Sequence, residues 1–252
     1  MPKQKQDVAA AAKGASLDVA GPLSQEELAA LRRYDTPTVA NAIETFNVRP
    51  RNVGFLRPEI RCVFPELGVM VGYAVTARVR AAQPPARNEK TVSNFDWWDF
   101  LVKTPAPRVV VIEDLDKPAP VGVFWGEVQA NIHNALGCAG TVTNGGVRDL
   151  NEVGPLGFHF FAQHVIVSHA YVRMVEFGAP VQVGGLLIQT GDLIHADRHG
   201  VQVVPLGVAR EAPAAVDKIT ARERRIIDYC QSPEFTPEGL KSVMQDLQKQ
   251  TL

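Results

Sequence analysis

An acidic residue, an interval of twenty positions and an Arg-Asp pair stand near the middle of this 252-residue chain, as Glu127, Arg148 and Asp149. Two carboxylates can hold a hard divalent cation through oxygen, usually with water completing its shell. An arginine beside them can bind a substrate carboxylate through two parallel hydrogen bonds, or stabilise a developing enolate. These residue types therefore indicate metal-assisted chemistry on a small anionic acid.

Each of these residues also has a structural interpretation. Glu127 near a helix N-terminus favours the helix macrodipole without doing any chemistry. Asp149, with Glu152 three residues later, fits a helix-capping pair, and Arg148 could form an ion pair with either carboxylate. The residue types and their spacing leave both interpretations open.

One helix and one strand must position these side chains. Glu127 opens a predicted helix whose apolar stripe is Val128, Ile132 and Leu136, and Gly137 fits its C-cap. Residues 139–143 predict a short buried strand, and the Asn-Gly-Gly sequence of residues 144–146 predicts a turn. If the helix runs back along the strand, its N-terminus and the strand's carboxyl end meet at one edge of the sheet. Such edges are where α/β proteins bind ligands.

The elements expected elsewhere describe an α/β part followed by a β-rich part. The caps Ser24 (with Glu27) and Asp35 or Thr36 predict two N-terminal helices, and Pro37 fits the first turn of the second. Residues 95–102, which hold four aromatics, predict a short helix in a core, lid or subunit contact. Further predicted helices cover 206–230, broken near Pro213, and 236–248. Predicted strands cover 71–79, 108–113, 158–161, 165–167, 179–183, 186–189, 193–196 and 201–204.

Composition excludes several functional classes. The formal net charge is −1, from 26 basic and 27 acidic residues, which argues against nucleic acid or an anionic membrane as a partner. No apolar run approaches the roughly 20 residues that cross a bilayer. The cysteines Cys62, Cys138 and Cys230 are widely spaced, which indicates reduced thiols and a cytoplasmic location. Residues 1–21 are expected to form a mobile tail.

A second candidate metal motif lies near the end of the β-rich part, where His195, Asp197 and His199 alternate. Alternate residues of a hairpin strand share a face for purely geometric reasons. A strand entering a tight Arg-His-Gly turn explains this pattern better than a metal site. Cys138 lacks a histidine partner in the sequence and is interpreted as a small buried thiol.

The run GEVQANIHNALGCAGTVTNGGVRDLNEV resembles the RraA-like family, and LRRYDTPTVANAI, VGYAVTARV and GDLIHADRHGVQVVP extend the resemblance over roughly residues 26–230. This family includes class II 4-hydroxy-4-methyl-2-oxoglutarate / 4-carboxy-4-hydroxy-2-oxoadipate aldolases and the regulator of ribonuclease E activity. The resemblance implies an α/β fold, a three-layer β/β/α sandwich of the swivelling phosphohistidine-domain type with flanking N- and C-terminal helices. We expect this domain to span 22–205 and a C-terminal helical extension, packed on the same domain, to span 206–252, although the part after Cys230 lies beyond what the resemblance explains. Homotrimers or homohexamers are implied as well.

The resemblance also implies a role for each site residue. The substrate would be bound by backbone N–H groups of the segment Gly126, Glu127, Val128 and Gln129. Arg148 would bind its pyruvyl part, and Asp149 would ligate Mg²⁺ or Mn²⁺. Glu127 matches the family's acidic partner, which either positions a metal-bound water or acts in proton transfer. The implied activity is a divalent-metal-dependent retro-aldol cleavage of a small 2-oxo acid to pyruvate, with oxaloacetate decarboxylation as a side activity.

Two other functions stay open. One is a non-catalytic protein-binding regulator of the ribonuclease E inhibitor type. The other is a metal-dependent dehydratase or lyase of another acid on the same site. The segment 83–104 and the loop EDLDKPAPVGVFW depart from the family's pattern and precede Glu127, so they could reshape the substrate pocket.

Overall fold

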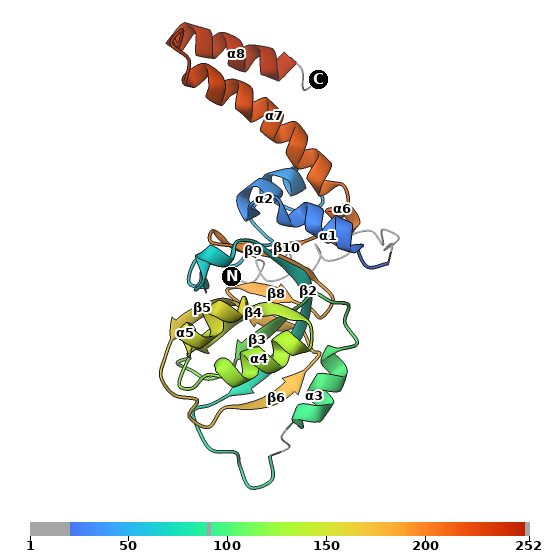
Figure 1. Ribbon diagram of the computed structural model, residues 1–252, viewed down its shortest axis with the longest axis vertical. Coiled ribbons are helices and arrows are strands. Elements are labelled where there is room, and N and C mark those ends of the chain that lie inside the picture. Colours follow the sequence, from blue (N-terminus) through green and yellow to red (C-terminus); the bar gives the residue numbers. More distant parts are fainter. Residues whose placement is uncertain (1–20, 90–91, 250–252) are drawn as a thin grey trace, which may run out of the picture.

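The computed structural model describes residues 21–89 and 92–249, and its centre is an eight-stranded mixed sheet (Figure 1). The strand order is β1-β5-β4-β3-β2-β9-β10, and β6 pairs with β2 beside this path. The strands of this sheet are β1 Arg61–Cys62, β2 Met70–Arg80, β3 Arg108–Asp114, β4 Cys138–Val147, β5 His159–Val165, β6 Arg173–Phe177, β9 Leu193–Asp197 and β10 Gly200–Val204. The strands β7 Val181–Val183 and β8 Leu186–Ile188 form a separate two-stranded sheet.

The helices lie on one face of this sheet and at one end of the molecule (Figure 1). They are α1 Gln25–Arg32, α2 Thr36–Thr45, α3 Asn94–Leu101, α4 Glu127–Ala135, α5 Leu150–Val153, α6 Leu206–Ala209, α7 Ala212–Cys230 and α8 Pro237–Lys249, with 3-10 turns η1 Pro65–Leu67 and η2 Gly154–Leu156. None of the helices in the described parts of the chain is long and apolar enough to cross a membrane.

The middle of the sheet is parallel and is buried on both faces. β2, β3, β4 and β5 pair in parallel, while β1, β6, β9 and β10 join in antiparallel fashion. In β3, Val109 and Val111 belong to one hydrophobic cluster, and Val110 and Ile112 belong to another on the opposite face. This two-sided burial confirms the interpretation of the continuous apolar run as a buried strand.

The two faces carry different layers. The β7–β8 hairpin contributes Val181, Val183 and Ile188 to the cluster on one face. Helices α3, α4 and α5 cover the other face, where α4 and α5 lie in front of the strands in Figure 1. The predicted α/β fold with hairpin, sheet and helix layers is confirmed.

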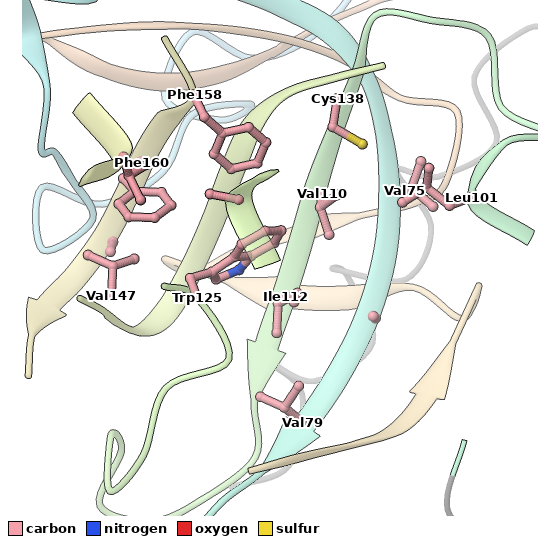
Figure 2. Close-up of a cluster of buried hydrophobic side chains, with 14 of the residues drawn as sticks. Val75, Val79, Leu101, Val110, Ile112, Trp125, Cys138, Val147, Phe158 and Phe160 are labelled. Atoms are coloured by element: carbon pink, nitrogen blue, oxygen red, sulfur yellow. The ribbon is translucent and has the colours of Figure 1, made fainter. Parts of the chain in front are cut away.

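An aromatic core lies under α4 (Figure 2). Trp125 is 1 % exposed, and its ring centroid is 5.4 Å from that of Phe158. In Figure 2 it lies among Ile112, Val147 and Phe160. Because Trp125 stands two residues before α4 begins, its burial fixes the position at which the helix starts.

The terminal helices pack against the end of the sheet formed by β2, β9 and β10. Ser24 and Glu27 form the predicted capping box of α1, and Asp35 caps α2 by accepting a 2.8 Å hydrogen bond from the Thr38 N–H. α7 has Pro213 in its first turn and packs against α2, whereas α8 packs against α7 and both project away from the sheet (Figure 1). The proposed domain boundaries stay a prediction, and the predicted tail lies outside the described residues apart from Gly21.

The strand predictions need correction at two places. β6 (Arg173–Phe177) was not expected, because its charged residues hide the alternation. Residues 158–161 and 165–167 are not two strands, since β5 is continuous from His159 to Val165. Parallel pairing with β4 along most of this length keeps β5 extended through its polar positions, Gln163 and His164.

In the alternating motif, His195 and Asp197 hold the helices to the sheet, whereas His199 bonds to Asp197 Oδ1 through its N–H at 2.8 Å and its Nδ1 at 3.1 Å. Buried His195 donates from Nε2 to the Leu31 carbonyl oxygen at 3.1 Å, and its Nδ1 accepts from the Thr36 hydroxyl at 3.0 Å. Asp197 accepts a 2.9 Å hydrogen bond from the Thr36 N–H. The structural interpretation of this motif is thus confirmed.

The three cysteines are unpaired. Cys138 is buried, and its burial raises the pKa of the thiol to about 12. Such a thiol stays protonated near neutral pH and is a poor nucleophile. The prediction that Cys138 is a small buried thiol beside the central motif is confirmed.

Candidate active site

The start of α4 and the end of β4 meet through backbone and side-chain hydrogen bonds. The Arg148 N–H donates to the Trp125 carbonyl oxygen at 3.1 Å, and Trp125 forms an isolated parallel bridge with Val147. Two residues after Trp125, the Glu127 N–H donates to Asp149 Oδ2 at 2.9 Å. The predicted meeting of helix N-terminus and strand end is therefore confirmed.

The strand that leads to Arg148 contains a bulge where a turn was predicted. β4 continues through Asn144, Gly145 and Gly146, and its pairing with β5 shifts register between Thr143 and Gly146. The Asn144 side chain explains why the chain stays extended. It accepts from the Asp114 N–H at 2.8 Å and donates to the Asp114 carbonyl oxygen at 3.0 Å, so it replaces a peptide group of the ladder to β3.

Gly146 is needed for close packing of the loop that precedes α4. A Cβ at this position would lie 2.7 Å from Val123 Cγ1. The bulge therefore does two things. It brings the loop against the strand, and it sets the direction in which Arg148 and Asp149 leave the sheet.

Asp114 at the end of β3 is the most perturbed carboxyl near this bulge. Its Oδ1 accepts from the Asp116 N–H at 2.9 Å, whereas its buried Oδ2 has no hydrogen-bond partner. Burial raises the pKa of Asp114 from 3.8 to about 6. The folded protein therefore binds this proton at a higher pH than the unfolded chain does, and the associated stability is lost as the pH rises from about 4 to about 6.

We expect Asp114→Asn to remove the pH dependence of stability that the Asp114 carboxyl causes. The free energy of unfolding of the variant, relative to the parent protein, should increase by about 2 kcal/mol between pH 4 and pH 7.5. Urea unfolding at the two pH values measures the difference. Parallel pH profiles for the two proteins would contradict the burial of an unpaired charge at this position.

Asp149 adopts a left-handed backbone conformation, with φ 58° and ψ 46°. Its carboxylate turns back to α4 and makes no capping hydrogen bond to α5. Its carbonyl oxygen accepts from the Glu152 N–H at 3.2 Å and from the Val153 N–H at 3.0 Å. The interpretation of Asp149 and Glu152 as a capping pair is therefore wrong, because the left-handed φ directs the side chain away from α5. Non-glycine residues in this conformation cluster at functional sites.

Gly126 allows this close approach. A Cβ at Gly126 would lie 2.4 Å from Asp149 Oδ2 and 3.1 Å from Arg148 Nε. We expect Gly126→Ala to displace both side chains and to lower the kcat/KM of the activity proposed below by about tenfold or more. The free energy of unfolding, measured alongside, should change by roughly 1–3 kcal/mol, the usual cost of overpacking. Unchanged kcat/KM would contradict the tight packing of these three residues.

These residues line a cleft of about 220 Å³. The segment 126–129 forms one wall, and Arg148 and Asp149 form another. The cleft is completed by Val123 and Phe124, which belong to the loop EDLDKPAPVGVFW that was expected to shape the pocket, and by His169 and Val172. No local sequence pattern marks His169 or Val172 as a residue of the cleft.

Val128 shows where the predicted apolar stripe of α4 was wrong. Its side chain is 69 % exposed and lines the cleft, while α4 buries Ala130 and His133 instead. His133 can be buried because its Nδ1 donates to the Gln129 carbonyl oxygen at 2.7 Å and its Nε2 accepts from Trp97 Nε1 at 2.9 Å. Burial lowers the pKa of His133 to about 4, so it is a neutral support for the helix near neutral pH.

The aromatic segment around Trp97 thus has a core role. Trp97 is 1 % exposed in α3, and its ring lies 6.3 Å from that of Phe100 and 5.8 Å from that of Phe177. Through His133 this helix supports α4 from behind. The more exposed ring of Phe95 is on the same short helix.

Several charged groups in the cleft have donor or acceptor atoms that can still form hydrogen bonds to a ligand. Among the described residues, the Glu127 carboxylate and Asp149 Oδ1 make no hydrogen bond. Arg148 lies 3.5 Å from Asp149 Oδ2 and donates to the Val167 carbonyl oxygen only at 3.4 Å. Its guanidinium can therefore still bind an incoming carboxylate.

The donor set suits Mg²⁺ or Mn²⁺ better than a metal held entirely by protein. No group of three or more His, Cys, Asp or Glu side chains able to hold a metal occurs within the described ranges. Mg²⁺ is usually bound by one or two carboxylates, with water and substrate oxygens in the remaining positions. A free oxygen of Asp149 and the nearby Glu127 fit that requirement.

Comparison with known proteins identifies the family. The RraA-like family (Aldolase/RraA) matches residues 36–203. A protein of Halalkalibacterium halodurans named "Putative 4-hydroxy-4-methyl-2-oxoglutarate aldolase" is 32 % identical over 108 residues, which is 41 % of this chain and 51 % of that protein. Protein DlpA of Legionella pneumophila is 25 % identical over 142 residues, 56 % of this chain and 23 % of that protein. The chain thus aligns with only about half and about a quarter of these relatives.

Solved structures share the fold. An uncharacterised protein of Pseudomonas syringae pv. tomato has a TM-score of 0.69 at 24 % identity, covering 92 % of this chain and 100 % of that one. Streptomyces coelicolor RraAS2, described as an unusual member of the RNase ES inhibitor RraA protein family, has a TM-score of 0.59 at 21 % identity, covering 81 % of this chain and 96 % of that one. The family match across residues 36–203 shows that the chain belongs to the RraA-like family.

Proposed function

We propose that this protein is a divalent-metal-dependent lyase that cleaves a small 2-oxo acid to pyruvate by a retro-aldol reaction, and that it decarboxylates oxaloacetate on the same site. One observation carries the proposal. One cleft at a helix N-terminus is lined by Arg148, whose contacts are a 3.5 Å ion pair and a 3.4 Å hydrogen bond, by the carboxylate of Glu127 and by Asp149, which keeps its Oδ1 free of hydrogen bonds among the described residues. The aldolase named among the relatives supports the same chemistry.

Each residue has a distinct task in this proposal. The Arg148 guanidinium binds the substrate's C1 carboxylate, and first-turn N–H groups of α4 that lack intrahelical partners face the same end of the substrate. Asp149 would hold the cation, which leaves Glu127 available as a base. A divalent cation bound there supplies the Lewis acidity that polarises the 2-oxo group.

The cleavage step needs one base. Glu127 accepts the proton of the C4 hydroxyl, the C4 oxygen forms a carbonyl, and the C3–C4 bond breaks. The electron pair of that bond passes to C3 and gives the enolate of pyruvate, whose negative charge Arg148 stabilises. Protonation at C3 completes pyruvate, so atoms and charges balance without an oxidant or reductant.

The assembly implied by the resemblance, a homotrimer or homohexamer, belongs to the proposal too. Exposed apolar side chains beside the cleft support a subunit contact there. Val165, Val167 and Tyr171 are 56 %, 92 % and 56 % exposed. Sedimentation equilibrium of the full chain measures the assembly state.

Pyruvate release tests the activity. The protein is incubated with oxaloacetate or 4-hydroxy-4-methyl-2-oxoglutarate, with Mg²⁺ or Mn²⁺, and in parallel with a chelator. Turnover that requires the cation is expected for oxaloacetate at least. If neither substrate gives metal-dependent pyruvate, the lyase proposal is wrong, and a protein-binding regulator on the same fold becomes the better account.

A further inference from the structure

The cleft is lined by both charged and apolar side chains. Glu127, Arg148 and Asp149 are its charged lining. Val123, Phe124, Val128 and Val172 supply apolar side chains to the same cleft. A retro-aldol substrate has a charged pyruvyl part and a carbonyl fragment that leaves. We therefore assign the charged lining to the pyruvyl part and the apolar lining to the leaving fragment.

The charges that line the cleft limit which substituents of a substrate can lie against its apolar side chains. Arg148 is the one permanent cation among the residues that line the cleft within the described chain, and Glu127 and Asp149 oppose it with two carboxylates. The other basic group, His169, has its Nδ1 2.8 Å from the Ala170 carbonyl oxygen and donates to it. Nearby Arg173 is paired with Glu89 at 2.6 Å and 2.9 Å. A second carboxylate on the substrate would therefore lack a cationic partner.

Val128 is an unusual member of the apolar lining because of its position in α4. At 69 % exposure it is an apolar side chain in the first turn of a helix, beside the carboxylates and the arginine. Helix first turns favour acidic and small polar residues. An apolar side chain here gains nothing from the helix itself, so contact with an apolar ligand group is a reason for its presence.

We propose that the physiological substrate is a 4-hydroxy-2-oxo acid whose C4 substituents are alkyl or aryl groups rather than a second carboxylate. This inference rests on the lyase function proposed above. Arg148 binds the single carboxylate, and Val123, Phe124, Val128 and Val172 contact the substituents on C4. The products are pyruvate and an uncharged aldehyde or ketone, with the same bond breakage and proton transfers as above.

A matched pair of substrates tests the inference. 4-Hydroxy-4-methyl-2-oxopentanoate differs from 4-hydroxy-4-methyl-2-oxoglutarate only in carrying a methyl group where the latter carries its second carboxylate. We expect kcat/KM for the former to be higher by about tenfold or more, because an unpaired carboxylate in an apolar part of a site is strongly disfavoured. Replacing one methyl group on C4 of the pentanoate by phenyl should raise kcat/KM further.

Two variants separate binding preference from intrinsic reactivity. Val128→Arg adds a cation among the apolar lining residues. It should raise kcat/KM for the glutarate relative to that for the pentanoate by about tenfold. Val128→Gln is the long, uncharged control and should shift it much less. Thermal unfolding of both variants checks that they fold. If either does not, Val128→Leu serves as a further variant, and because it keeps the position apolar it should keep the preference for the pentanoate.

The outcomes distinguish this inference from the proposed function. Oxaloacetate turnover by the unmodified protein, together with a preference for the glutarate, overturns the inference and leaves the lyase function standing. Equal ratios in the Arg and Gln variants also overturn it. So does a change of oligomeric state in Val128→Arg without a change of ratio, because Val128 then serves a subunit contact.

Discussion

Asp149→Asn should reduce metal-dependent pyruvate release by roughly 10²–10³-fold, because polarisation by a bound cation supplies several kcal/mol of barrier reduction. The fold should persist. The asparagine oxygen can still accept the Glu127 N–H, which now donates to Asp149 Oδ2 at 2.9 Å. Steady-state turnover across a range of Mg²⁺ and Mn²⁺ concentrations measures the loss, and the variant should also lose its response to a chelator.

Glu152→Gln provides the matched control for Asp149→Asn. Glu152 is an exposed carboxylate three residues along the chain and is not among the residues that line the cleft. Its amide variant should keep both the activity and the metal dependence. An Asp149→Asn protein that unfolds readily while its folded fraction remains fully active would show that Asp149 serves only to cap α4.

Arg148→Lys should lower kcat/KM by about 10²-fold, the usual cost of removing one donor that acts on transition-state charge. Lysine keeps the charge but cannot reproduce the planar fork that binds a carboxylate through two parallel hydrogen bonds. Since Arg148 lies only 3.5 Å from Asp149 Oδ2, the lysine variant should also bind the cation differently. Separate measurement of kcat and KM shows whether the loss is in binding or in enolate stabilisation.

Arg51→Lys provides the matched control for Arg148→Lys. Arg51 is 76 % exposed and forms a surface ion pair with Glu44 at 3.3 Å, far along the chain from the cleft. Such pairs contribute little to stability, so this variant should behave as the parent protein does. If Arg148→Lys is equally silent, the substrate carboxylate is bound elsewhere and the assignment of Arg148 is wrong.

Local chemistry made several elements predictable. The capping box of Ser24 and Glu27, the Asp35 cap before Pro37 and the continuous apolar run of β3 each depend on neighbouring residues. Hydrogen bonds to helix ends and the burial of apolar runs have short sequence range, so their patterns are visible in a single chain. The spacing of Glu127 from Arg148 belongs with these, because one helix and one strand span it.

Non-local packing decided the features that were missed. The Asn-Gly-Gly sequence is typical of a turn, yet it forms a bulged strand because Asn144 bonds to the backbone of Asp114, thirty residues earlier. The helix stripe with Val128 was wrong because Trp97 of a distant helix supplies a partner for His133, which lets that polar ring replace Val128 in the core. Neither contact leaves a trace in the local pattern.

By itself, the sequence determined the family, the α/β class and the three charged residues that could do chemistry. The tertiary structure alone decided how those residues face one another. The left-handed conformation of Asp149 aims its carboxylate at α4, and the absence of a side chain at Gly126 makes room for it. The structure also placed Val123 and Val172 at the cleft, since the approach of two loops depends on register and packing between segments far apart in the chain.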